Sequence, residues 1–153
     1  MCCAAAGAGH TAAMHIERAV CVDDDLAAAV ARLLPQLNPK ARLPAREELA
    51  SMVANPSTHL LVARDPEIVG TLTLTVFWTL VGLQGRINTL VVDAAVRGRG
   101  VGEALTREAV RIAEAAGVRR ITLSSRRERA AAHRLYGRVG FESTPNETFH
   151  MLL

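Results

Sequence analysis

Residues 97–102, RGRGVG, combine glycines and arginines in a pattern that suits the binding of an anion. They follow an apolar run and open directly into a predicted helix. Glycines permit a tight turn with exposed backbone N–H groups, and the start of a helix adds partial positive charge. Arg97 and Arg99 add charged donors that match phosphate oxygens. The segment is a candidate seat for a pyrophosphate, although glycines in a strand-to-helix turn are more often purely structural.

Two common nucleotide-binding motifs are excluded. No Gly-Lys-Ser/Thr follows the loop, so it is not the phosphate loop of the nucleoside triphosphatases. The spacing of Gly98, Gly100 and Gly102 also departs from the dinucleotide-binding fingerprint, whose third glycine stands one residue later. Neither motif therefore accounts for the loop.

The segment AHRLYGRVGF, residues 132–141, contains the only tyrosine of the chain, Tyr136. Taken alone, one tyrosine on an amphipathic helix is usually a core aromatic whose hydroxyl is satisfied inside the protein. A chemical role for Tyr136 depends on the motif around it.

The elements that position these groups follow from the spacing of apolar residues. We expect strands at 14–22, 59–64, 68–78, 86–92 and 121–124, helices at 23–34, 46–54, 101–116 and 129–139, and strand-like segments near Phe141 and at 148–153. Pro35 is expected to end the first helix, and two glycines make residues 80–85 a loop. Residues 1–13 are expected to be a flexible tail, with Met14 an alternative start, and residues 14–153 a single domain.

With both motifs in this order, the chain resembles the GCN5-related N-acetyltransferase (GNAT) superfamily from about Met14 to its end. Two family patterns are present without gaps: Arg/Gln-x-x-Gly-x-Gly/Ala at Arg97, Gly100 and Gly102, and Ala-x-x-Leu-Tyr-x-x-x-Gly-Phe at Ala132, Leu135, Tyr136, Gly140 and Phe141. The resemblance implies an α/β fold of the α+β type. Its mixed, mostly antiparallel central sheet would carry helices on both faces and splay between the fourth and fifth strands.

The resemblance also implies roles for particular residues. The loop N–H groups would hold the pyrophosphate of coenzyme A, and the strand before the loop would pair with the pantetheine arm and polarise the thioester carbonyl. The implied cofactor-binding residues are Leu90, Val91, Val92, Arg97, Gly98, Arg99, Gly100, Val101 and Gly102. Arg129 stands where relatives carry an asparagine, and it either reaches a phosphate or simply begins a solvated helix. Tyr136 matches the tyrosine that points at the coenzyme sulfur, which makes it the implied general acid.

The general base is left open. Many relatives carry a glutamate at positions matching Arg86 or Asn88, and neither residue is acidic here. Asn88 can hold a water molecule but cannot itself take a proton from an ammonium group. Four alternatives remain, each also explained as a surface or packing residue: Glu47, Glu48, His59 and His150.

Composition and charge limit the kinds of partner that the protein is expected to bind. The net charge is +3, and eleven of the 17 arginines fall between residues 97 and 138, which suits a phosphorylated small molecule or nucleic acid. Nucleic acid is not expected, because five aromatic residues are too few for a base-stacking surface.

The cysteines and histidines lack metal-ligand spacing, so we expect no metal. No apolar run is long enough to span a membrane, and a cytoplasmic location is expected. A homodimer surface is left open at Phe77, Trp78, Leu80 and Val81.

Three functions are weighed. The leading one is an enzyme that transfers an acetyl group from acetyl-CoA to a primary amine of a small molecule or peptide, by direct attack in a ternary complex. No cysteine lies near the motifs to carry the acetyl group. The missing glutamate favours instead a catalytically weak acyl-CoA-binding or regulatory module, and the arginines favour nucleic-acid binding. Aminoglycosides, polyamines, amino acids and protein N-termini all remain open as acceptors.

Overall fold

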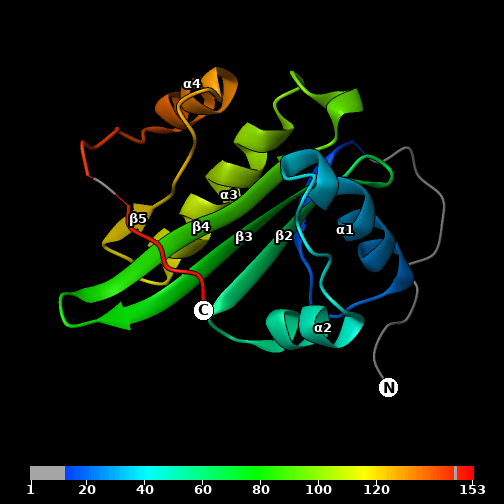
Figure 1. The fold of residues 1–153 in the computed structure, drawn as a ribbon, viewed down its shortest axis with the longest axis horizontal. Helices are drawn as coiled ribbons and strands as arrows, with labels where there is room; N and C mark the ends of the chain where they lie inside the picture. Colours follow the sequence, from blue (N-terminus) through cyan, green and yellow to red (C-terminus); the bar gives the residue numbers. More distant parts are fainter. Residues whose placement is uncertain (1–12, 147) are drawn as a thin grey trace.

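The computed structural model describes residues 13–146 and 148–153, which contain one five-stranded sheet (Figure 1). Its strands, in order across the sheet, are β1 (His15–Arg18), β2 (Thr58–Arg64), β3 (Ile68–Thr79), β4 (Gly82–Val92) and β5 (Arg120–Thr122). The strands from β1 to β4 pair antiparallel, and β5 runs parallel to β4. The prediction of a mixed, mostly antiparallel sheet is confirmed. The predicted tail, residues 1–13, lies almost wholly outside the described residues.

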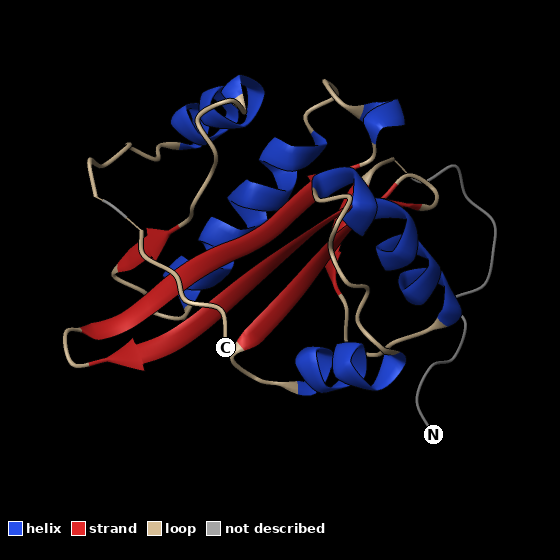
Figure 2. Cartoon of the chain, viewed as in Figure 1, coloured by secondary structure: helices blue, strands red, loops and turns tan. Residues whose placement is uncertain are grey.

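Helices cover both faces of the sheet (Figure 2). One face carries α1 (Asp24–Leu37) and α2 (Arg46–Ala54), and the other carries α3 (Val101–Ala115), which follows the short 3-10 helix η1 (Ala94–Val96). The last helix, α4 (Ala130–Val139), contacts α3. None of the described helices is long and apolar enough to cross a membrane.

Two apolar cores hold the sheet between these helices. Strand residues alternate between faces, so neighbours along β2 contribute to opposite cores. Leu61 lies in the core on the α3 side with fully buried Leu105, whereas Leu60 lies in the core on the α1 side with fully buried Leu33. Residues of β4 enter both cores, which fixes this strand between the two helical layers.

Pro35 does not end α1, contrary to the prediction, since the helix continues to Leu37. A proline removes the helical hydrogen bond to the carbonyl of the residue four positions earlier, here Ala31. Ala31 is exposed, so its carbonyl can be hydrated instead. The extra turn brings Gln36 and Leu37 to the rim of the cleft described below.

The prediction of a loop at residues 80–85 is also wrong. Strand β4 begins at Gly82, and only Leu80 and Val81 form the turn. Gly82 has a φ of 111°, a conformation that suits glycine at the end of a turn. Gly85 is buried, and a Cβ there would lie 3.3 Å from side-chain carbons of both Ile121 and Val118. This glycine serves close packing between strands, which sequence alone does not distinguish from a loop signal.

The end of the chain differs most from the prediction. Strand β5 spans only Arg120–Thr122 instead of 121–124, and no strand forms in residues 141–146 or 148–153. A strand needs a neighbour to pair its backbone groups and a face to bury its apolar side chains. Neither is present here: Phe149, Met151, Leu152 and Leu153 are all more than 80% exposed.

Candidate active site

Strands β4 and β5 form a fork that opens into a cleft. They pair only at residues 84–86 of β4, and beyond Arg86 no described strand lies along this edge of β4. A cleft of about 860 Å³ follows the open edge, and its walls are the end of α1, the loop before α3, and α4. The splay predicted between the fourth and fifth strands is confirmed.

The cleft brings together almost all of the predicted site residues. Its lining includes Leu90, Val91, Val92, Arg97, Gly98, Gly100, Val101, Gly102, Arg129 and Tyr136. Arg99 is the exception, because it is exposed and does not line the cleft. Two segments separated by about thirty residues thus face one space.

A β-bulge interrupts β4 where it lines the cleft. Thr71 pairs with Val91 and Thr73 pairs with Asn88, so Thr89 and Leu90 together oppose the single residue between them on β3. Thr89 has a φ of 53°, which is unusual for a β-branched residue. A bulge turns backbone groups out of the ladder and often lies beside an active site. Because the β5 side of this segment is open, backbone groups that the bulge turns toward it would be available to a ligand in the cleft.

The glycine-rich loop has the geometry of an anion seat. Gly98 and Gly100 have φ values of 81° and 79°, and Gly100 is the N-cap of α3 without any side-chain cap. A Cβ at either glycine would have no neighbour within 4 Å. The start of α3 thus has free space on the side of these missing Cβ atoms, and the N-cap residue leaves its first N–H groups without a side-chain cap.

Gly102 has a different reason to be glycine. It is buried, and a Cβ there would lie 2.8 Å from Cδ1 of Leu135 and 3.5 Å from Cγ2 of Val92. A real Cβ could not occupy that place unless Leu135 moved. Gly102 thus lets α4 approach the start of α3, and the width of the cleft depends on it.

Contacts with α1 hold the loop in place, and sequence reasoning missed them. Arg32 of α1 forms a salt bridge with Asp93 and donates to the carbonyl of Ile68 at 2.7 Å. The Gln36 side chain accepts the N–H of Ala94 at 2.9 Å. Asp93 also caps η1 by accepting the N–H of Ala95 at 3.1 Å. Such long-range pairs have no signal in local spacing.

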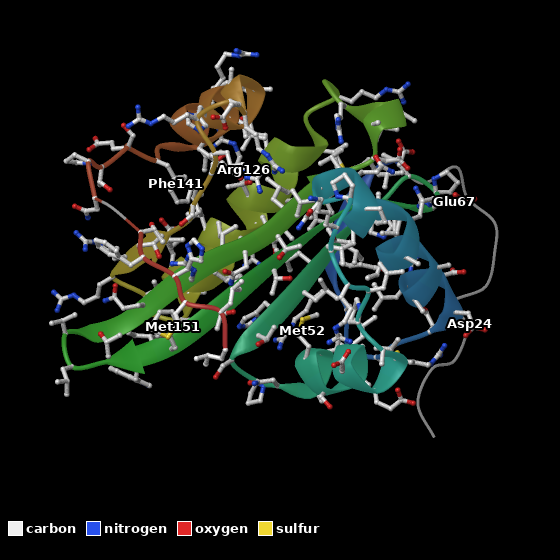
Figure 3. The ribbon with its side chains drawn as sticks, viewed as in Figure 1. Asp24, Met52, Glu67, Arg126, Phe141 and Met151 are labelled. Carbon is white, nitrogen blue, oxygen red and sulfur yellow. The ribbon has the colours of Figure 1, made fainter. Side chains whose placement is uncertain are left out.

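Tyr136 lies half-buried in the cleft wall on α4. Its ring meets that of Phe141 edge-on, with centroids 6.0 Å apart (Phe141 is labelled in Figure 3, just past α4). Burial raises the pKa of the Tyr136 hydroxyl, and the nearby Arg129 charge opposes that rise. The phenol therefore keeps its proton at neutral pH, as a proton donor must.

Two arginines of the predicted set are held by backbone carbonyls. Arg129, the N-cap residue of α4, donates to the carbonyl of Leu37 at the end of α1, at 2.9 Å. The Nε of Arg97 donates to the carbonyl of Val92 at 3.2 Å. Arg129 thus spans the cleft between α4 and α1. Its positive charge lies at the C-terminal end of α1, where the helix dipole stabilises a cation.

The candidate bases are not brought together. Asn88 accepts a hydrogen bond from Arg86 at 3.2 Å, and Glu48 caps α2 while bound by Arg42. His59 pairs with Leu74, which faces α3, so it lies on the opposite face from Asn88, whose partner is Thr73. Burial lowers the pKa of His59. Glu47 on α2 and His150 near the C-terminus are exposed.

No described residues form a cluster of three or more side chains suited to a metal ion. The cleft lining does contain two carboxylates, Glu103 and Glu128. Hydrogen bonds from Arg138 and Arg107 hold the pKa of Glu103 below its ordinary value, which makes it a poor base. None of these groups is an evident general base.

Glu103 links α3 to α4. Its carboxylate accepts from Arg107 at 2.8 Å and from Nε of Arg138 at 3.0 Å, and Arg107 also donates to the Arg138 carbonyl at 3.2 Å. Because α4 has no fully buried residue, these contacts and Leu135 hold it in place.

Replacing Glu103 with glutamine should loosen α4. We expect amide exchange in α4 to speed up by a small factor, on the order of threefold, since surface ion pairs are weak. Glu108→Gln is the control, because Glu108 pairs with Arg111 inside α3 only. The same link should weaken in the native protein as pH falls through the lowered pKa of Glu103. Hydrogen exchange measured by mass spectrometry checks this, and equal exchange in both variants would contradict it.

The profile of the acetyltransferase (GNAT) family matches residues 24–141, which include every element from α1 to α4. The chain belongs to this family. The matched residues include the bulged strand, the glycine-rich loop and Tyr136, all of which contribute to the lining of the cleft. The resemblance inferred from the two motifs is confirmed.

Solved structures agree with the GNAT fold. A putative acetyltransferase from Agrobacterium tumefaciens is 27% identical with a TM-score of 0.73, and the match covers 91% of this chain and 99% of that one. An aminoglycoside acetyltransferase from an uncultured soil metagenomic sample, solved with sisomicin, is 19% identical with a TM-score of 0.78 over 92% and 97% of the chains.

A third similar structure is AAC(6')-Iy, solved with the bisubstrate analog CoA-S-monomethyl-acetylneamine. It is 18% identical with a TM-score of 0.73 over 93% and 99% of the chains. At this identity the last two structures bear on the fold alone. Among curated proteins, none matches this sequence.

Proposed function

We propose that this GNAT protein is an N-acetyltransferase that moves an acetyl group from acetyl-CoA to a primary amine. One observation carries the proposal: a single cleft is lined by an uncapped glycine-rich helix start, a bulged strand with an open edge, and a protonated tyrosine. The solved relative that contains a CoA bisubstrate analog is consistent with a CoA-based donor.

The cleft fits the two ends of acetyl-CoA. The space above Gly98 and Gly100 would take the pyrophosphate, with Arg97 supplying a charged donor. The open edge of β4 at Leu90, Val91 and Val92 would pair with the amide groups of pantetheine, and Val101, Gly102 and Arg129 would complete the walls. When bound, the coenzyme supplies the acetyl thioester.

Groups of the protein itself assist the acetyl transfer at two points, the carbonyl oxygen and the departing sulfur. A backbone N–H at the bulge stabilises the negative charge that develops on the carbonyl oxygen. The neutral acceptor amine attacks the carbonyl carbon, so that a C–N bond forms and the C–S bond breaks. Tyr136 gives its phenolic proton to the departing sulfur. The nitrogen loses one proton to solvent as the amide forms, since we assign no side chain as base, and the Tyr136 phenolate regains a proton from solvent.

The decisive experiment offers acetyl-CoA and a panel of primary amines to the purified protein. We expect thiol release that depends on the amine, and a product acetylated on nitrogen by mass spectrometry. Varying both substrates should give intersecting double-reciprocal lines, as a ternary complex requires. Binding of acetyl-CoA without turnover of any amine would mean instead a coenzyme-binding module without catalysis.

The acceptor is expected to be a small-molecule or peptide amine, as in the relative solved with sisomicin. Phe77, Trp78, Leu80 and Val81 are exposed at the β3–β4 turn, where a homodimer would be sought. We also predict a cytoplasmic location and no binding of nucleic acid.

Arg97→Ala should weaken acetyl-CoA binding by about 1–3 kcal/mol, the scale of a hydrogen bond to a charged group. Arg99→Ala is the comparison, because Arg99 lies beside the same glycines but outside the cleft lining, and we expect a smaller loss. Titration calorimetry measures both. Equal losses would show that charge near the loop matters and that contact in the cleft does not.

A further inference from the structure

Arg86 stands at the apex of the fork, on the face of the sheet that α3 does not cover. It is the last β4 residue paired with β5, opposite Thr122. On its other side it pairs with Thr75, whose neighbour Leu74 belongs to the α3-side core. Because neighbours along a strand face opposite ways, Arg86 and Thr75 point to the face on which α1 and α2 lie.

The Arg86 guanidinium is exposed and forms no ion pair with the residues that the structure describes. Its Nε donates to Asn88 at 3.2 Å, and a terminal nitrogen lies 3.4 Å from the hydroxyl of Ser124, which lines the cleft. No described acidic side chain lies within ion-pair distance of it. A planar guanidinium held by neutral partners retains donors for an incoming anion.

This arginine is too far from the loop to serve the coenzyme phosphates. Val92 lies six positions after Arg86 in β4, which at about 3.3 Å per residue places the two about 20 Å apart. The phosphate seat lies beyond Val92, at residues 97–102. A coenzyme running along β4 from that seat would bring its reactive end toward the fork. An acceptor that approaches on the face opposite α3, the acceptor face, would meet Arg86 there.

The charges around the cleft agree with an anionic acceptor. Its lining contains four arginines and two glutamates, and Arg138 together with Arg107 already neutralises Glu103. At the fork itself, the side chains on the acceptor face are neutral or cationic: Thr73, Thr75, Gln84, Arg86, Asn88 and Ser124. A polycationic acceptor would find no carboxylate among these side chains.

We infer that the acceptor is a small primary amine carrying a carboxylate or phosphate group, and that Arg86 binds this group. The inference rests on the proposed function and narrows its substrate class. It makes Arg86 a specificity-determining residue. The guanidinium donates to two anionic oxygens of the acceptor while the amine of the acceptor reaches the thioester.

The test uses matched amines that differ only in the anionic group. Amino acids are compared with their amides, glucosamine 6-phosphate with glucosamine, and spermidine represents cationic acceptors. We expect the best kcat/KM with an anionic amine and a loss of about tenfold to a hundredfold when its charge is removed, the scale of a charge-assisted hydrogen bond. The carboxylate and phosphate pairs show which anion is preferred.

Variants decide whether Arg86 is responsible. Arg86→Gln should erase the preference for the charged member of each pair, and Arg86→Glu should reverse it, with acetyl-CoA affinity unchanged. Arg119→Gln is the control, because Arg119 is exposed, does not line the cleft and forms no ion pair with a described residue. A preference that survives in Arg86→Gln, or a best wild-type substrate that is cationic, would overturn the inference.

Binding separates this inference from the proposed function. Saturation-transfer NMR on the CoA-loaded protein reports whether anionic amines bind, whether or not they are acetylated. Binding that requires Arg86, without turnover, would support the inference and contradict the enzyme. Turnover without any charge preference would support the enzyme and contradict the inference. If anionic amines do not bind at all, the inference is refuted.

Discussion

Tyr136→Phe is expected to lower kcat by about tenfold to a thousandfold, overlapping the usual contribution of a general acid, and to leave acetyl-CoA affinity nearly unchanged. The hydroxyl acts when the sulfur departs, so its loss affects the transition state more than the bound ground state. The phenylalanine ring can keep its edge-on contact with Phe141, so the fold should survive.

The pH profile adds a second signature for Tyr136. A general acid must be protonated, so kcat falls as pH rises through its pKa. Burial raises that pKa, which moves this alkaline fall above the ordinary tyrosine value of about 10. Tyr136→Phe should lack the fall. Turnover, coenzyme affinity and melting temperature are measured on one preparation, and an unchanged kcat would return Tyr136 to a packing role.

Gly100→Leu should abolish detectable acetyl-CoA binding. Gly100 has a φ of 79°, and its missing Cβ faces open space at the start of α3, where the pyrophosphate would lie. A leucine would fill that space and would also strain the backbone by about 1–3 kcal/mol. Calorimetric titration with acetyl-CoA measures the loss.

Gly117→Leu is a matched control for the strain. Gly117 has a φ of 81° with no neighbour around its missing Cβ, but it follows the opposite end of α3. Both variants should lose similar stability, and only Gly100→Leu should lose the coenzyme. Full affinity in Gly100→Leu would remove the loop from the site. Gly102→Leu should disturb both folding and binding, because Leu135 already occupies the place of its side chain.

Sequence predicted the parts of this site that local pattern encodes. The spacing of Arg97, Gly100 and Gly102 and the later Leu135-Tyr136 pair identified the family, the loop and the cleft wall. Short-range spacing carries such information because a turn or a helix start places strict demands on neighbouring residues.

The remainder depends on contacts between distant residues. The bulge at Thr89 comes from the register between β3 and β4, and the bond between Arg32 and Asp93 joins α1 to the loop. Neither has a local signature. The predictions at Pro35 and Gly85 are wrong for the same reason. The exposed carbonyl of Ala31 allows the helix to continue through Pro35, and side chains from other elements pack closely against Gly85.

The most direct test of the central claim is a crystal structure of the protein bound to coenzyme A. We predict the pyrophosphate on the N–H groups of residues 98–102, the pantetheine along the open edge of β4, and the sulfur within hydrogen-bond reach of the Tyr136 hydroxyl. Coenzyme bound outside the fork, or a sulfur that points away from α4, would contradict this account of the site.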